Sequence, residues 1–271
     1  MKAFLYGAPI GLLGGLIGLG GAEFRLPVLT RVFGYKATNA VPINLAISLL
    51  TVVAALASRL STASMDGLLT LVPVIGMLTM ASMTGAYLGS AYLYRIHESG
   101  IERVIMVLLA AIGGVLVIES FFAFTSQRLA DGTIANIALE LVLGFGIGIV
   151  SSLLGIAGGE LIIPTLILVF GVEVKIAGTA SLIISTATIM VGFLRYLRRD
   201  SYNERSDVTQ VILPMGLGSI IGAVVGGALV GNVSSGYLKL LLGLLLITSA
   251  VKMFHPSTAV PTSSVALPIK K

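Results

Sequence analysis

The sequence has no cysteine, only two histidines and few charged residues. Without cysteine, disulfides, Cys-ligated zinc and thiol chemistry are excluded. The histidines, His97 and His255, are too few and too polar in their surroundings to indicate a metal site. Charged residues make up 11% of the chain, against roughly 25% in an average soluble domain. We therefore expect no metal and no cofactor, and the low charge argues against an ordinary soluble fold.

Apolar sequence is what the chain has in abundance. Hydrophobic residues make up 56% of it. Apolar runs of about 20 residues recur, and each is long enough to cross a hydrocarbon core of roughly 30 Å. We expect an all-α polytopic membrane protein with apolar segments near 3–20, 22–34, 39–58, 68–94, 101–122, 134–156, 160–170, 176–197, 208–231 and 236–254.

The net charge of +5 does not indicate nucleic-acid binding. Most Lys and Arg residues lie between the apolar segments, where the positive-inside rule places cations beside a membrane. The N-terminal apolar run is not followed by a small-residue cleavage site, so we expect it to be retained rather than removed as a signal peptide. The lipid bilayer is the expected surrounding, in the cytoplasmic (inner) membrane, with several passes.

An internal repeat is the strongest pattern in the chain. A shift of 137 residues aligns GLGGAEFRLPVLTRVFG (residues 18–34) with GIAGGELIIPTLILVFG (residues 155–171) without a gap. A Glu and a Pro recur in register inside both apolar copies, as Glu23/Glu160 and Pro27/Pro164. The pattern predicts a first membrane repeat over 1–123, a linker over 124–137, a second repeat over 138–254 and a flexible tail over 255–271.

The first half of each repeat is predicted to be a broken-helix hairpin. A helix over 22–34 would be about 20 Å long, which is too short to span the bilayer. The glycines before it suggest two helical arms that meet inside the membrane. If three full helices follow each hairpin and the loop 195–205 is cytoplasmic, most Lys and Arg residues lie inside, with Arg59, Arg128, Lys175 and Lys239 outside. Three spans is an odd number, so the two repeats are predicted to be inverted.

Inverted repeats with broken helices are typical of secondary transporters, with the binding site at the interface between repeats. At each break the first N–H groups of the short helix have no intrahelical partner, which favours an anion. Tight helix packing is the simpler explanation for other glycine pairs such as Gly85/Gly89 and Gly222/Gly226. We predict substrate contacts from Gly18, Gly20, Gly21, Ala22, Glu23, Arg25, Asn44, Gly155, Gly158, Gly159, Glu160, Thr179 and Ser181, with Pro27 and Pro164 in structural roles.

The sequences GLGGAEFRLPVL, GIAGGELIIPTL and AGTASL resemble the paired signature of the TauE/SafE sulfite-exporter family. The resemblance covers nearly the whole chain, although Ala22 replaces the third glycine of the commoner pattern in the first copy. It implies a secondary transporter that moves a small sulfur-containing oxyanion, such as sulfite or a sulfonate, and is driven by an ion gradient. An anion channel, or a carrier of a non-sulfur anion on the same scaffold, is the alternative.

The two glutamates allow two interpretations. A carboxylate in the first helical turn gains about 0.3–1 kcal/mol from the helix dipole. A carboxylate inside a membrane costs about 2.5–3.5 kcal/mol, which protonation would relieve, so Glu23 and Glu160 could instead couple anion movement to a proton. Because the neighbouring Arg25 makes the charged state of Glu23 easier to hold, we expect Glu23 to be the more sensitive of the two.

The remaining polar candidates also allow more than one role. Arg25 could contact the anion, pair with a glutamate or extend toward the cytoplasm. Asn44, Thr179 and Ser181 could donate to the substrate or simply hydrogen-bond between helices. No His/Asp/Ser or metal-ligand cluster lies at midplane depth, so we expect no enzyme. The small anion is the expected partner, and the sequence leaves a homodimer open.

Overall fold

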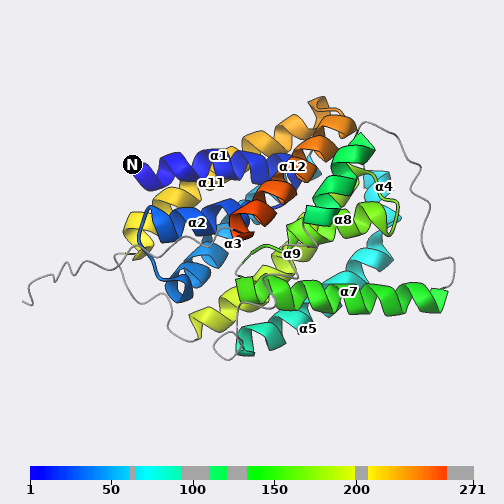
Figure 1. Ribbon diagram of the computed structural model, residues 1–271, viewed down its shortest axis with the longest axis horizontal. Helices are drawn as coiled ribbons and strands as arrows, with labels where there is room; N and C mark the ends of the chain where they lie inside the picture. The colour runs from blue at the N-terminus through cyan, green and yellow to red at the C-terminus, as the bar shows by residue number, and fades with distance from the viewer. Residues whose placement is uncertain (62–64, 93–109, 121–132, 155, 199–206, 255–271) are drawn as a thin grey trace, which may run out of the picture.

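The computed structural model describes residues 1–61, 65–92, 110–120, 133–154, 156–198 and 207–254 (Figure 1). This part of the chain is helical, with no strand. Besides the apolar helical segment Ala110–Ser120, the elements are α1 (Lys2–Ile17), α2 (Ala22–Arg31), α3 (Ala37–Leu60), α4 (Met65–Leu69), α5 (Val72–Tyr92), α7 (Thr133–Leu154), α8 (Gly159–Leu168), α9 (Val174–Leu197), the π-helical turn η1 (Val208–Ile212), α11 (Leu213–Leu229), the 3-10 turn η2 (Val230–Asn232) and α12 (Ser235–Phe254).

Four of the described helices are long and apolar enough to cross a bilayer. They run over Asn39–Leu60, Val72–Gly89, Val174–Leu197 and Val208–Asn232. The expected apolar segments agree with these helices to within a few residues. The expected segment 101–122 is described only over Ala110–Ser120.

The helices of the second half recur with the same offset of 137 residues that relates the two sequence motifs. Helices α2 and α8 correspond residue for residue, and so do α3 and α9. The residue before α2 is Gly21 with φ 71°, and the residue before α8 is Gly158 with φ 76°. The residues before α3 and α9, Lys36 and Glu173, are both extended. The two copies of the motif therefore fold alike.

The short helix α2 ends at Arg31 and not at residue 34 as expected. The N–H of Tyr35 donates to the carbonyl of Leu29 at 3.1 Å, and Gly34 between them has φ 72°. This seven-residue closure around a left-handed glycine at the end of the helix terminates it. The second copy ends in the same way at Gly171, with φ 65°. With ten residues, α2 is only about 15 Å long.

Helices α1 and α2 form a hairpin. A Cβ placed on Gly21 would lie 2.8 Å from the carbonyl oxygen of Ile10, so the start of α2 lies against the middle of α1. Beyond the end of α2, the ring of Phe33 meets that of Tyr6 edge-on, with centroids 6.4 Å apart. The chain therefore returns to the end of the molecule where α1 begins (Figure 1).

Each first helix of a repeat packs against a helix of the other half. Helix α1 lies along α11, and α7 lies along α5 (Figure 1). Gly7 contacts the backbone of Met215, and Gly15 contacts that of Ala223, so α1 and α11 run parallel. Gly85, Gly144 and Gly148 make the equivalent close approaches between α5 and α7, and Gly222 does so between α11 and α1. The packing role considered for Gly85 and Gly222 is therefore what the structure shows.

Helices α3 and α9 cross the interior in opposite directions. The Arg59 side chain near the end of α3 bonds the carbonyl of Lys175 in the first turn of α9, at 3.2 Å. Leu45, Val52, Leu182 and Ile189, all buried, share one apolar cluster between these helices. These two helices form the inner wall beside which both glycine breaks lie.

Candidate functional site

The candidate site is built on the two glycine breaks. In the first, Gly18, Gly20 and Gly21 have φ values of 99°, 81° and 71°. In the second, Gly158 has φ 76°. Side-chain-bearing residues rarely adopt these left-handed conformations, so glycine is required for the turns themselves. Gly155, the remaining predicted break residue, lies outside the described residues.

The breaks come together in the interior of the bundle. A Cβ on Gly18 would lie 2.4 Å from the carbonyl oxygen of Gly178 at the start of α9, closer than any side chain permits. A Cβ on Gly159 would lie 2.9 Å from Cα of Leu19 in the first break. The sequence motifs, although 137 positions apart, therefore form a single junction between the two halves.

The amino ends of α2 and α8 carry no side-chain caps. Both cap positions are glycines, Gly21 and Gly158, which have no side chain to accept from the first turn. Ala22 and Gly159 begin the two helices. Pro27 and Pro164 lie inside them, and each removes the N–H that would bond the carbonyl four residues earlier, that of the glutamate. Both helix ends therefore present positive dipole ends at the junction.

Arg25 is completely buried and turned toward α3. Its Nη1 donates to Ser48 Oγ at 2.8 Å and to Asn44 Oδ1 at 3.4 Å. Its Nη2 donates to Thr51 Oγ1 at 3.1 Å and to the Gly20 carbonyl at 3.2 Å. Of the three roles considered for Arg25, extension of its side chain toward the cytoplasm is therefore wrong. The guanidinium instead links α3 to the first break.

Asn44 stabilises the same corner from the other side. It is fully buried, and its Nδ2 donates to the carbonyl of Ala22 at 3.0 Å. That carbonyl belongs to the first residue of α2. The predicted interhelical bond is thus present, and it fixes the amino end of α2 against α3 next to the Arg25 head group.

Glu23 and Glu160 meet across the junction. Their carboxyl groups interact by charge and by a side-chain hydrogen bond. The charge of Glu23 also acts on Arg25. Glu160 is only 4% exposed, and its Oε1 has no hydrogen-bond partner among the described residues.

The second half has no cation equivalent to Arg25, because Ile162 occupies that position. Ser181 and Ser185 on α9 correspond to Asn44 and Ser48 on α3. Both serines are completely buried, and neither hydroxyl finds a hydrogen-bond partner in the part of the chain that the structure describes. A Cβ on Gly159 would lie 3.1 Å from Ser181 Oγ, so this serine lies beside the second break.

Thr179 is grouped with a different arginine. Its hydroxyl donates to the carbonyl of Lys175 and accepts from Arg59 Nη1 at 3.3 Å. Arg59 is 1% exposed, and it also donates to the carbonyls of Gly15 at 2.9 Å and Leu16 at 2.7 Å. The sequence predicted Arg59 on the same outer side as Lys175, whose carbonyl it bonds, but did not predict that its side chain is buried. The guanidinium caps the carboxyl end of α1 at the junction.

Four contributing residues were missed by sequence reasoning: Ser48, Thr51, Arg59 and Ser185. Ser48 and Ser185 are themselves a repeat pair, 137 positions apart. Their position one turn beyond Asn44 and Ser181 on the same helical face was the available signal.

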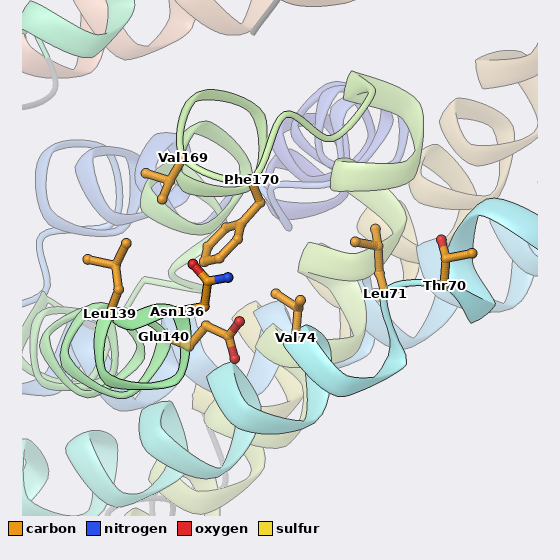
Figure 2. A pocket seen from close by; sticks show the side chains of 8 residues that line it. All are labelled: Thr70, Leu71, Val74, Asn136, Leu139, Glu140, Val169 and Phe170. Carbon is orange, nitrogen blue, oxygen red and sulfur yellow. The ribbon is translucent and has the colours of Figure 1, made fainter. Parts of the chain in front are cut away.

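A separate pocket lies at the far end of the second hairpin (Figure 2). It has a volume of about 90 Å³ and joins Asn136 and Glu140 of α7 to Val169 and Phe170 just beyond α8. Figure 2 shows the Glu140 carboxylate and the Asn136 amide beside the Phe170 ring. This pocket does not contain the predicted site residues. Nowhere in the described residues do three or more His, Asp or Glu side chains gather as metal ligands.

Comparison with known proteins shows the family to which the chain belongs. The family model described as sulfite exporter TauE/SafE matches residues 1–116 and 140–269. The probable membrane transporter protein MJ0441 of Methanocaldococcus jannaschii is 32% identical over 121 residues. That alignment covers 42% of this chain and 43% of the relative, so the chain spans less than half of the length of the curated relative it matches. No solved structure matches the chain. The chain belongs to the TauE/SafE sulfite-exporter family of membrane transporters.

Proposed function

We propose that the protein is a secondary transporter that moves a small sulfur-containing oxyanion, such as sulfite or a sulfonate, across the cytoplasmic membrane. The site is the junction of the two breaks, where the amino ends of α2 and α8 meet. The observation that carries the proposal is the close approach of Gly18 to Gly178 and of Gly159 to Leu19, which brings both dipole ends into one buried place. The family match supports the sulfur oxyanion as substrate.

Two inverted repeats, over 1–123 and 138–254, account for the directions of the helices. Helices α3 and α9 are equivalent in sequence and run in opposite directions. Helix α1 runs parallel to α11, which is the equivalent of α5, as an inversion requires when each hairpin returns to its own side. Non-helical backbone at membrane depth is tolerated when it is enclosed by protein, as the breaks are here.

An ion gradient drives the transport, and the proton is the coupled ion. The support is the pair of carboxyl groups, Glu23 and Glu160, that touch at the junction. Two carboxyl groups in contact do not readily hold two negative charges, so such a pair takes up a proton. Anion movement past the junction then changes how strongly that proton is held.

The experiment is uptake of labelled sulfite and of several sulfonates into proteoliposomes. Gly21→Val and Gly158→Val are expected to abolish uptake, because a β-branched residue cannot hold the left-handed backbone that orients each helix end. Gly34→Val is the matched control: Gly34 also has φ 72°, but it is exposed and has no neighbouring atom within 4 Å of a Cβ. Near-normal uptake in both site variants would move the site elsewhere. Uptake that never exceeds the electrochemical equilibrium of the anion would indicate a channel.

A further inference from the structure

We propose that the two halves divide the positive charge at the junction. Arg25 is a fixed cation in the first half, and Glu160 binds the exchangeable proton in the second. This rests on the proposed function and deepens it, since it names the group that carries the coupled proton. It also reverses the expectation from sequence that Glu23 is the more sensitive glutamate.

The argument begins with the equivalence of the two sites. Helices α2 and α8 have identical bounds after the shift of the repeat, and so do α3 and α9. The left-handed caps before α2 and α8 differ by only a few degrees in φ. Equivalent residues therefore occupy equivalent places, and the surroundings of Ile162 can be compared with those of Arg25.

In the first half, one guanidinium satisfies four oxygen atoms. They belong to Asn44, Ser48, Thr51 and the carbonyl of Gly20. A buried cation of this kind is held only where oxygen atoms replace its lost hydration. The first half therefore contains a permanent cation, the guanidinium of Arg25, which is part of the chain.

In the second half the same positions carry oxygen atoms but no cation. Thr188, the equivalent of Thr51, bonds Ser82 of α5 in place of a cation, with 2.7 Å between the hydroxyl oxygens. Ser181 and Ser185 are buried with no hydrogen-bond partner among the described residues. Buried polar groups are almost always hydrogen-bonded, so two orphans side by side indicate a group that the apolar Ile162 does not supply.

Glu160 supplies that group when it is protonated. It is the residue after Gly159, which contacts Ser181, and its own Oε1 also has no partner in the described part of the chain. A protonated Glu160 has one O–H, which the Glu23 carboxylate accepts, and its Oε1 remains an acceptor for a serine hydroxyl. Proton uptake at Glu160 therefore gives the buried oxygen atoms of the second half a hydrogen-bond partner, as Arg25 does in the first half.

The charged groups around Glu160 determine which glutamate holds the proton. From α2, Glu23 touches Glu160, and the charge of Arg25 acts on Glu23. From α3, Arg59 is bonded to carbonyls of α1 and to α9, and from α7, Glu140 lies near the opposite end of α8.

Because Arg25 is the neighbour of Glu23, Glu23 keeps the negative charge, and Glu160 takes the proton. The proton leaves Glu160 to the aqueous side as the cycle proceeds.

The first experiment is infrared spectroscopy of the purified protein in lipid at neutral pH, which requires no substrate. A protonated buried carboxyl gives its own C=O stretching band. We expect that band in the wild type and in Glu23→Gln, and its loss in Glu160→Gln. A band that persists in Glu160→Gln or disappears in Glu23→Gln overturns the assignment, whatever anion the protein carries.

The second experiment is flux in proteoliposomes, with protein-free liposomes as the blank. One coupled proton supports about tenfold accumulation per pH unit. Glu160→Gln should lower that ratio to about one and keep exchange of labelled for unlabelled anion, whereas Glu23→Gln should keep the dependence on the pH gradient. Ser185→Ala keeps the carboxyl and should shift the pH at which uptake is half-maximal, which Ser61→Ala, on the surface, should not. Wild-type gradient dependence in Glu160→Gln, or accumulation that follows a Na⁺ gradient at constant pH, overturns the proposal.

Discussion

Replacement of Gly18 by alanine tests how closely the two halves approach each other. Gly18 has φ 99°, and a Cβ there would lie 2.4 Å from the carbonyl oxygen of Gly178. The position of this Cβ is set by the backbone of residue 18, and the oxygen belongs to the backbone of α9. Neither atom can therefore rotate away. The substitution therefore imposes a strained conformation and a collision at once.

The two penalties can be estimated separately. A left-handed backbone costs a residue with a side chain roughly 1–2 kcal/mol. Overpacking in a fixed interior costs roughly 1–3 kcal/mol more, so Gly18→Ala should lower the free energy of unfolding by about 2–5 kcal/mol. Gly34→Ala carries only the first penalty, because Gly34 has φ 72° and open space around it. Gly76→Ala carries neither and should be stabilising by about 0.5–1 kcal/mol, because Gly76 lies within α5 with nothing within 4 Å.

The assay is thermal unfolding of the three purified variants in one detergent, followed by the loss of helical circular dichroism. The expected order of stability is Gly76→Ala, then wild type, then Gly34→Ala, then Gly18→Ala. If Gly18→Ala were no less stable than Gly34→Ala, the two breaks would not be in contact, and the junction on which the site depends would be refuted.

Three further predictions concern the rest of the scaffold. Arg59→Met should destabilise the protein by at least about 1–3 kcal/mol, because it leaves carbonyls at the end of α1 buried without donors; an unchanged unfolding temperature would contradict this. Gly222→Leu should prevent folding, since a Cβ there meets a backbone oxygen at 2.0 Å, whereas Gly231→Leu, with nothing within 4 Å, should yield folded protein by size-exclusion chromatography. In this cysteine-free chain, an impermeant thiol reagent added to intact cells should label Asp131→Cys but not Asp200→Cys; labelling of the latter would reverse the proposed orientation.

The sequence was sufficient to predict the elements that depend on backbone conformation. A glycine at a break or after a short helix has a local physical requirement, a left-handed turn, which does not depend on distant packing. Gly21 and Gly158 at the predicted breaks meet that requirement, whereas the left-handed turns at Gly34 and Gly171, which end α2 and α8, were not predicted. For the same reason, the recurrence of the motif correctly predicted that the two copies fold alike.

The partners of long side chains could not be predicted in the same way. Arg59 follows an apolar run in the sequence, where a cation usually marks the membrane surface. The structure buries it, because the end of α1 and the start of α9 together offer three carbonyl oxygens to one guanidinium. That arrangement depends on segments more than 100 positions apart, and hydropathy along the chain contains no information about it.

The packing of α1 on α11 and of α5 on α7 determines which parts of the bundle are rigid. Along α1 and α11, glycines bring the two backbones so close that a Cβ on Gly7, Gly11 or Gly15 would lie 2.2 Å from a carbonyl oxygen of α11. Contacts between backbones leave no layer of side chains that could repack during sliding, since close-packed interiors change between discrete arrangements rather than deforming continuously. Helix α1 therefore moves with α11. The short helices α2 and α8 are attached to these rigid pairs through left-handed glycines, which are the conformationally permissive points of the fold. We therefore expect that, when the proposed site opens from one side of the membrane to the other, the backbone bends at the glycines of the two breaks.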